Sequence, residues 1–236
     1  MHVARIAQLL QPFLSPVPDA GHSGLDARSG EESAVLSPAQ LDLISMYIDM
    51  LKHWNARINL TAIRDEEEIV TRHFGESLFA ARCLFPEAAS PSEAERGRVR
   101  VADLGSGAGF PGIPMKLWVP SIQLTLIESN HKKATFLREV CRSLTLTDVD
   151  IQNIRGEEVV QTYGTVTLRA VENFAEALQI AARLMSPEGR LGLLIGSSQL
   201  EFARSTLPAM VWQPPVPVPL SQSRVFLLGR VPNLDR

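Results

Sequence analysis

Between residues 99 and 196, apolar runs of strand length alternate with stretches that have helical periodicity. The apolar runs fall at 99–105, 123–129, 148–154, 164–170 and 190–196, and the helical stretches at 112–119, 130–144 and 173–185. Such alternation is typical of repeated βαβ units, in which helices join parallel strands. The pattern predicts an α/β fold with a mostly parallel, doubly wound sheet. A final strand near 224–231 is expected to join this sheet as an antiparallel hairpin.

The residues before the alternating region are expected to be mainly helical. Ser37 suits the N-cap of a helix, Pro38 its first position and Gln40 the reciprocal capping partner. Apolar residues then recur at helical spacing as far as Ile58, which predicts one buried helix face. A second helix is expected within residues 65–85.

Two polar segments, at 15–37 and 87–98, have the composition of loops. A short helix is expected before the first of them. The expected organisation has three parts, which are a flexible N-terminal extension at 1–37, a helical part at 38–98 and a core at 99–236.

Composition narrows the class of protein. The chain of 236 residues is 45% hydrophobic and 21% charged, which is ordinary for a soluble globular protein. It has neither an apolar run of the ~18 residues that suggest a membrane span nor the features of a signal peptide. Cys83 and Cys141 form no pattern typical of disulfides or metal ligands. We therefore expect a cytoplasmic monomer without a metal, and the net charge of −3 leaves room only for a local basic patch.

The segment VADLGSGAGFPGIP at 101–114 joins the first expected strand to its helix. Gly105, Gly107 and Gly109 can adopt conformations that let a ligand approach the backbone closely. A dinucleotide-binding turn needs its third glycine where Phe110 stands, and the prolines that follow lack the N–H groups that hold a pyrophosphate. The turn favours a nucleoside without phosphates, such as S-adenosylmethionine, over a nicotinamide dinucleotide or a purely structural turn.

Two acidic residues support this interpretation. Asp103 lies at the end of the first expected strand, where it can face the cationic amino group of S-adenosylmethionine directly or through water. Glu128 ends the second expected strand, about 20 residues beyond the turn, where a carboxylate is expected to bind ribose hydroxyls.

Several motifs in one order resemble the RsmG (GidB) family of methyltransferases. They are LKHWNARINLTAI at 51–63, RHFGESL at 72–78, DLGSGAGFPGIP at 103–114, SNHKKATFLREV at 129–140, IRGEEV at 154–159 and LRAV at 168–171. The resemblance implies a Rossmann-like class I methyltransferase with an N-terminal helical extension. It also implies methyl transfer from S-adenosylmethionine to N7 of a guanine in small-subunit (16S) ribosomal RNA.

The resemblance also implies the site residues. The expected cofactor-binding residues are Asp103, Gly105, Gly107, Phe110, Glu128, Ser129, Asn130, Gly156, Glu157 and Arg169. Glu128, Ser129 and Asn130 would meet the ribose, and Gly156 and Glu157 would flank the adenine. Arg169 is also the expected catalytic residue, at the mouth of the site. The candidate RNA-binding residues are Asn55, Asn59, Arg72 and His73.

Several of these candidates have structural alternatives. Asn55 and Asn59 could end a helix and shape the next turn, His73 could be a structural histidine, and Arg169 could form an ion pair. A basic helix face could be solvated or could meet RNA phosphates, and it consists of Lys132, Lys133, Arg138 and Arg142.

Neutral guanine has a free lone pair at N7, so the reaction needs orientation rather than a general base. The target base should be unpaired or extruded from its helix. Glu76, Thr165 and Ile195 depart from the family pattern, and Ile195 replaces a lysine. Two alternatives therefore remain, which are methyl transfer to an acceptor other than RNA and a non-catalytic relative that associates with the ribosome.

Overall fold

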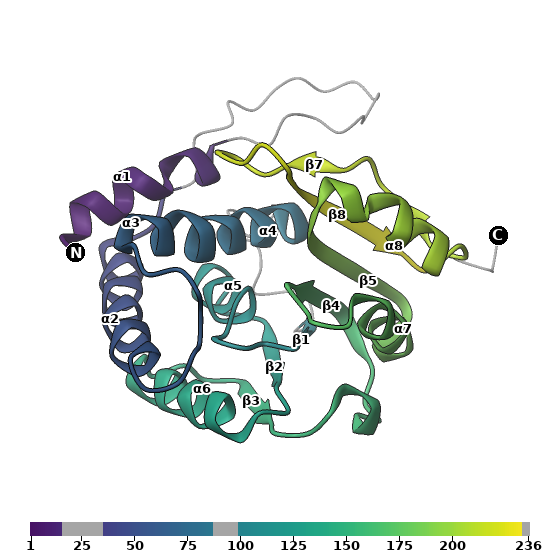
Figure 1. The fold of residues 1–236 in the computed structure, drawn as a ribbon, viewed down its shortest axis with the longest axis horizontal. Coiled ribbons are helices and arrows are strands. Elements are labelled where there is room, and N and C mark those ends of the chain that lie inside the picture. Colours follow the sequence, from purple (N-terminus) through teal and green to yellow (C-terminus); the bar gives the residue numbers. More distant parts are fainter. Residues whose placement is uncertain (16–34, 87–98, 233–236) are drawn as a thin grey trace.

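A computed structural model of the chain describes residues 1–15, 35–86 and 99–232. An eight-stranded sheet runs through its centre (Figure 1). Its strands are β1 (Arg100–Leu104), β2 (Gln123–Ile127), β3 (Val149–Gln152), β4 (Tyr163–Arg169), β5 (Met185–Gly196), β6 (Val211–Trp212), β7 (Val216–Pro217) and β8 (Arg224–Arg230). The strand order is β3-β2-β1-β4-β5-β8-β6, and β7 pairs with β8.

Strands β1 to β5 are parallel, and β8 is antiparallel to β5. The predicted doubly wound sheet and its antiparallel final strand are thus confirmed. The order of strands reverses between β1 and β4, because β2 lies on one side of β1 and β4 on the other. Ligands of open α/β sheets bind beyond the carboxyl ends of the strands at such a reversal.

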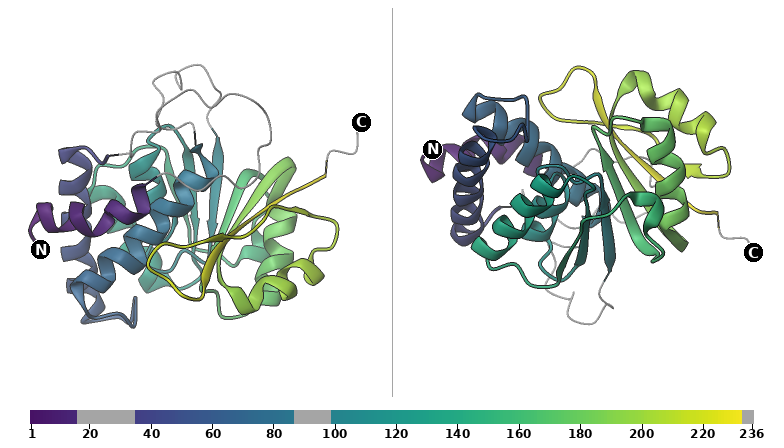
Figure 2. Two further views of the ribbon diagram at one scale, coloured as in Figure 1. Left: turned by 90° about the horizontal axis from the view of Figure 1, so that it is seen from above. Right: turned by 60° about the horizontal axis from the view of Figure 1, so that its bottom comes forward.

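Helices cover both faces of the sheet (Figure 2). One face packs against α4 (Glu76–Leu84), α5 (Gly112–Trp118) and α6 (His131–Ser143), and α2 (Pro38–Asn55) packs on the outer side of α5 and α6 (Figure 1). The other face packs against α7 (Phe174–Leu184) and α8 (Leu200–Thr206). The capping box at Ser37 and Gln40 is confirmed, with N–H···O distances of 3.2 and 2.8 Å. The sequence did not predict α8 or the short 3-10 helices η4 (Gly156–Glu158) and η5 (Ser197–Gln199).

The helix expected within 65–85 consists of three connected segments. They are α3 (Glu66–Glu68), the π-helical η1 (Ile69–Gly75) and α4. Residues five apart are paired in a π-helix, so its side chains are rotated relative to those of an α-helix. Such segments often occur at functional sites, and η1 carries Arg72 and His73.

The first helix, α1 (Val3–Leu14), is part of the fold. Its Ile6 and Leu10 are fully buried, and the ring of Phe13 lies so close to Gly75 that a Cβ there would come within 2.5 Å of it. The expected short helix is thus confirmed, and its burial differs from the flexible extension expected at 1–37. Residues 16–34 and 87–98 lie outside the described residues, and the three-part division of the chain stays a prediction.

Replacing Phe13 with alanine tests how firmly α1 is packed. The ring is 1% exposed, so its loss should lower the free energy of unfolding by about 3 kcal/mol. Urea unfolding measures this difference. Gln11→Ala on the exposed side of the same helix is the control and should stay within about 0.5 kcal/mol of the wild type. A similar loss in both variants would contradict the packing.

No helix in the described part of the chain is both long and apolar enough to cross a bilayer. Among the same residues, no three His, Cys, Asp or Glu side chains gather as metal ligands would.

Candidate active site

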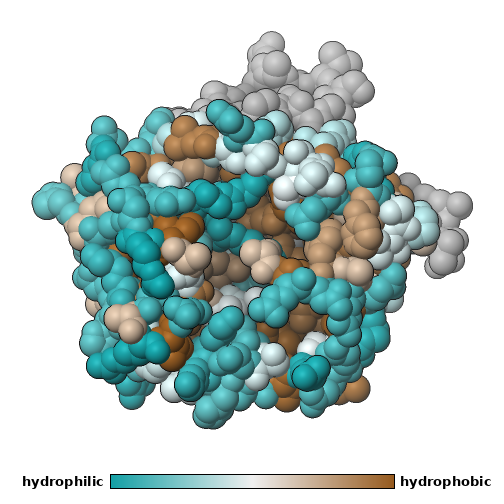
Figure 3. All heavy atoms as spheres, in the orientation of Figure 1, coloured by the Kyte–Doolittle hydropathy of each residue, from teal (hydrophilic) through white to brown (hydrophobic). Residues whose placement is uncertain are grey.

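A cavity of about 580 Å³ opens at the carboxyl ends of β1, β2 and β4. Sites for small molecules have volumes of roughly 300–1,000 Å³. Figure 3, drawn in the orientation of Figure 1, shows a hollow near the middle of the molecule, with hydrophilic residues around it. The predicted site residues that line the cavity are His73, Gly105, Gly107, Phe110, Glu128, Ser129, Asn130 and Arg169. The structure thus brings together residues from distant parts of the sequence.

The glycine turn forms the wall of the cavity that follows β1. Gly105, Gly107 and Gly109 have φ angles of +72°, +57° and +87°, which only glycine adopts without strain. At Gly105, a Cβ would lie 3.1 Å from Val171 Cγ1, on the loop that follows β4. At Gly109, it would collide with the hydroxyl of Tyr47. The positive φ angles confirm that this turn requires glycine, while close approach of a ligand to its backbone stays a prediction.

Glu128 fixes the turn to the end of β2. Its Oε2 accepts a hydrogen bond from the Gly107 N–H at 2.8 Å, and its Oε1 accepts one from the Asn130 N–H at 2.7 Å. Asn130 in turn caps α6 through its side-chain oxygen. Each carboxylate oxygen has a further lone pair, and the residue lines the cavity. Glu128 can therefore accept hydrogen bonds from a ligand such as a ribose.

Asp103 does not line the cavity, and the expected direct contact with an amino group is corrected here. The side chain is 1% exposed, and its two oxygens accept hydrogen bonds from the Gly112 N–H at 3.1 Å and the Thr167 hydroxyl at 3.0 Å. Burial raises the pKa of Asp103 to about 6. The carboxylate stabilises the turn from beneath, because its strand position directs it into the interior.

Gly156 and Glu157 also lie outside the cavity wall. The side chain of Arg183 on α7 donates hydrogen bonds to their carbonyl oxygens at 2.8 and 3.0 Å. A Cβ at Gly156 would lie 2.7 Å from Leu104 Cδ1, so the loop packs closely against the end of β1. Their expected place beside an adenine stays a prediction.

An aromatic stack joins the glycine turn to the N-terminal helices. Phe110 lies between Tyr47 and His73, with ring centroids 5.4 and 4.7 Å apart and interplanar angles of 9° and 14°. The hydroxyl of Tyr47 donates a hydrogen bond to the Ala108 carbonyl. The stack fixes the position of Phe110 at the cavity.

His73 lies on the cavity wall as a neutral imidazole. Its Nε2 is 2.7 Å from Thr61 Oγ1, while its Nδ1 is buried and has no hydrogen-bond partner among the described residues. Burial, together with the charges of Arg169 and Arg72, lowers the pKa of His73 to about 3. A neutral ring can hydrogen bond to a base but does not attract phosphate as a cation.

The lowered pKa predicts a pH dependence of folding. Below pH 6.5, the usual value for histidine, the unfolded chain binds a proton at His73 that the folded chain does not bind, so stability falls as pH falls. The stability of the wild type relative to His73→Gln should fall by about 1.4 kcal/mol per unit between about pH 6 and 4. Urea unfolding of both proteins measures this difference, from which other titrating groups such as Asp103 cancel. A difference independent of pH would contradict the assignment.

Arg169 ends β4 beside the cavity. Its Nη2 donates to the Arg72 carbonyl at 2.6 Å and pairs with Glu76 Oε2 at 3.2 Å. Its Nη1 is buried and has no hydrogen-bond partner in the described part of the chain. Burial lowers the pKa of Arg169 to about 10, so the guanidinium stays charged near neutral pH. The structural alternative, an ion pair, is confirmed. Arg169 also lines the cavity, and its role in binding or catalysis stays a prediction.

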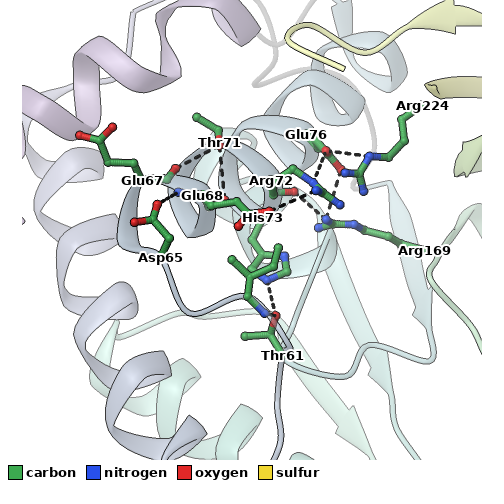
Figure 4. A network of polar contacts seen from close by, with 11 residues as sticks. Thr61, Asp65, Glu67, Glu68, Thr71, Arg72, His73, Glu76, Arg169 and Arg224 are labelled. Atoms are coloured by element: carbon green, nitrogen blue, oxygen red, sulfur yellow. Dashed lines mark hydrogen bonds and ion pairs between the residues drawn. The ribbon is translucent and has the colours of Figure 1, made fainter. Parts of the chain in front are cut away.

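Glu76 lies at the centre of three arginines (Figure 4). Its oxygens are 3.3 Å from Arg72 Nε, 3.2 Å from Arg169 Nη2 and 3.1 Å from Arg224 Nε. The pKa of Glu76 is raised, because the effect of burial exceeds the opposite effect of the three arginines. The sequence analysis identified Glu76 only as a departure from the family pattern, and it gave no indication that Arg224 on β8 would reach the same carboxylate.

The structure separates the two asparagine candidates. Asn55 is 7% exposed, its Oδ1 accepts from the Leu60 and Thr61 N–H groups, and its Nδ2 donates to the Thr61 carbonyl. Asn55 therefore has the structural role given as its alternative, because it shapes the loop that brings Thr61 to the cavity. Its polar side-chain atoms are buried in this loop, so its expected contact with RNA is corrected. Asn59 is exposed, and its RNA contact stays a prediction.

The other departures from the family pattern are buried. Thr165 is fully buried on β4. Ile195 is 4% exposed and packs in the hydrophobic cluster beneath α7 and α8, so no charged group takes the position of the family's lysine. The cavity also has lining residues that the sequence analysis missed, among them Thr61, Lys133 and Glu172. Lys133 belongs to the predicted basic face, whose other members, Lys132, Arg138 and Arg142, are exposed.

Comparison with known proteins agrees with this geometry. Residues 40–212 match the model of the GidB family, described as rRNA small subunit methyltransferase G. A Xylella fastidiosa (strain 9a5c) protein named Ribosomal RNA small subunit methyltransferase G is 40% identical over 153 residues, which cover 64% of this chain and 66% of that protein, just under two thirds of its length. A protein of the same name from Stenotrophomonas maltophilia is 38% identical over 190 residues, covering 80% and 81%.

Solved structures share the fold at low identity. Ribosomal protein L11 methylase from Lactobacillus delbrueckii subsp. bulgaricus has a TM-score of 0.54 and 13% identity, covering 67% of this chain and 80% of its own. TrmN from Thermus thermophilus has a TM-score of 0.52 and 17% identity, covering 69% and 53%. The fold is therefore that of class I methyltransferases, with a mostly parallel sheet between layers of helices. With the family match extending over residues 40–212, the chain belongs to the rRNA small subunit methyltransferase G family.

Proposed function

We propose that this chain transfers a methyl group from S-adenosylmethionine to N7 of a guanine in small-subunit (16S) ribosomal RNA. The observation that carries the proposal is the cavity wall formed by the glycine turn and the Glu128 carboxylate, in a member of this family. S-adenosylmethionine, when bound, supplies the methyl group from its sulfonium.

The residues present suit the cofactor. The left-handed glycines leave backbone surface open where side chains would fill it, and Glu128 offers acceptor lone pairs for ribose hydroxyls. Ser129 and Asn130 continue the same wall, and Phe110 adds an aromatic side chain whose position the stack fixes. These residues bind and orient the donor, which is the larger part of what methyl transfer to a lone pair requires.

The acceptor side of the cavity suits a purine base. Guanine N7 is a nucleophile in its neutral form, so no residue has to remove a proton first. The buried Arg169 Nη1 is an N–H group without a partner among the described residues, and O6 of guanine is an acceptor next to N7. The neutral His73 lies on the same wall. We assign Arg169 the role of orienting the base, with His73 beside it.

The proposed partner is the small ribosomal subunit or its 16S RNA, with the target base unpaired or extruded. We place the activity in the cytoplasm, in a monomeric enzyme that acts without a membrane or metal partner. The compartment, the monomeric state and the independence from membranes rest on the sequence. The reaction needs no metal because the lone pair of N7 needs no activation.

Methyl transfer from labelled S-adenosylmethionine to a set of acceptors tests the proposal. The acceptors are small subunits that lack the modification, naked 16S RNA, and the total protein and small-molecule extract of the same cells. We expect label in the RNA of one or both of the first two. Label in protein or in small molecules would show that the acceptor is not RNA and would support the alternative of a non-RNA acceptor. Cofactor binding without label in any fraction, or no binding at all, would favour the non-catalytic relative.

A further inference from the structure

Arg224 reaches Glu76, the partner of the cavity residue Arg169, from a part of the chain outside the family match. It begins β8, directly across from Gly196 at the end of β5, whereas the match ends at residue 212. Its side chain is 22% exposed, and its Nε pairs with Glu76 Oε1 at 3.1 Å. No other described residue pairs with its guanidinium, so the remaining N–H groups can bind a ligand.

Three arginines share one buried carboxylate. Arg72, Arg169 and Arg224 converge on the Glu76 carboxylate from η1, β4 and β8 (Figure 4). The other carboxylate of the cluster is Glu68, which is 3.3 Å from Arg72 Nη1. Asp103 also acts on Arg169, from beneath the turn, and His73 is neutral. The two outer arginines, Arg72 and Arg224, therefore share the Glu76 carboxylate with Arg169.

The arginine that lines the cavity is the least exposed of the three. The Arg169 side chain is 8% exposed and lines the cavity, whereas those of Arg224 and Arg72 are 22% and 40% exposed. The guanidiniums of Arg72 and Arg224 meet the same oxygen of Glu76, so they lie next to each other. Planar guanidinium groups bind phosphate through pairs of parallel hydrogen bonds.

We propose that Arg224 and Arg72, held in place by Glu76, bind a backbone phosphate of the RNA strand next to the target base. This inference rests on the proposed function, because it takes RNA as the acceptor. Glu76 acts here as a positioning residue, since it contacts neither base nor phosphate. A phosphate contact carries no sequence information and instead fixes the register of the strand, so that one base faces the cavity.

Arg224 lies close to a second guanidinium and shares its carboxylate with it. Burial lowers the pKa of Arg224, and the neighbouring charge of Arg72 lowers it further, against the opposite effect of Glu76 and Glu68. A phosphate between the two guanidiniums would offset their repulsion. Binding should therefore weaken with salt, as contacts to nucleic acid phosphates do.

Kinetics and salt dependence of Arg224→Ala test the proposal. We expect the KM for small subunits to rise about tenfold, while kcat and the Kd for S-adenosylmethionine stay near the wild-type values. The slope of log K for 16S RNA binding against log salt should become shallower by about 0.7–0.9, the value for one phosphate contact. Arg224→Lys should keep most of the slope because it keeps the charge.

Arg230→Ala is the matched control. Arg230 is an exposed arginine at the other end of β8, roughly 20 Å away by strand rise, and its loss should change neither KM nor the salt slope. If Arg224→Ala fails to bind S-adenosylmethionine, Arg224→Gln replaces it, because an amide can still donate to Glu76.

The outcomes separate the two proposals. A wild type that methylates subunits, with unchanged KM and salt slope in the Arg224 variants, would overturn the phosphate site alone. A wild type that labels no RNA would overturn the proposed function. In that case the salt slope of 16S RNA binding still decides whether Arg224 contacts phosphate.

Discussion

Replacing Arg169 with alanine should lower kcat for RNA methylation by about a hundredfold or more, as does the loss of one aligned donor in other enzymes. The physical reason is that Arg169 is proposed to orient the base, from a position fixed by Glu76 and the Arg72 carbonyl. The fold should persist, because Glu76 keeps Arg72 and Arg224 as partners. Single-turnover kinetics with saturating subunits measures the effect.

Arg169→Lys is the informative control for this prediction. Lysine keeps the charge beside Glu76 but has a single nitrogen, which cannot pair with Glu76 and also supply the second donor proposed for the base. We expect a loss close to that of alanine, with nearly unchanged affinity for S-adenosylmethionine. Activity near the wild-type level in either folded variant would remove Arg169 from the reaction.

Replacing Glu128 with alanine should raise the Kd for S-adenosylmethionine by about a hundredfold. The change removes the acceptor proposed for the ribose, and it also frees the N–H groups of Gly107 and Asn130 that hold the turn and the start of α6. Hydrogen bonds to a charged group contribute about 1.5–3 kcal/mol each, which corresponds to this range of affinity. Isothermal titration calorimetry measures it.

A conservative variant and a distant control accompany the Glu128→Ala measurement. Glu128→Gln keeps one acceptor oxygen and should lose only about tenfold in affinity. Glu188→Ala removes an exposed carboxylate near the start of β5, at the opposite edge of the sheet, and should change nothing. Equal affinities in wild type and Glu128→Ala would show that the cofactor does not bind against this wall.

Much of the fold could be predicted from periodicity alone. The five runs from 99 to 196 each became a strand, and the three stretches between them became α5, α6 and α7. The alternation of strands and helices is a local pattern with one favoured arrangement, and its connections restrict the topology. The π-helical η1 and the burial of α1 depend on contacts between distant segments, such as that of Phe13 with Gly75, which no local pattern contains.

The sequence predicts those parts of the site in which the backbone conformation restricts the type of residue. The glycine turn and Glu128 are such cases, because a left-handed turn requires glycine and the end of a second strand lies beside it. The burial of Asp103 could not be predicted, because the direction of its side chain follows from the strand register rather than from its position near the turn. Arg224 lies 152 residues after Arg72, and only the pairing of β8 with β5 brings them to one carboxylate.

The neutral state of His73 likewise required the structure. A histidine beside an arginine in sequence could be a phosphate ligand, and its spacing gives no sign of the burial that lowers its pKa. Its π-helical segment turns it toward Phe110 and the cavity, while Arg72 turns toward Glu76. Adjacent residues thereby have different neighbours, the ring of Phe110 for His73 and the carboxylate of Glu76 for Arg72.

Mass spectrometry of 16S RNA after reaction tests the central claim most directly. Small subunits that lack the modification are incubated with the chain and S-adenosylmethionine, and the RNA is digested to fragments and nucleosides. The account predicts one fragment that gains a single methyl group, carried as 7-methylguanosine. Methyl groups on another base, at another atom of guanine, or absent from RNA altogether would contradict it.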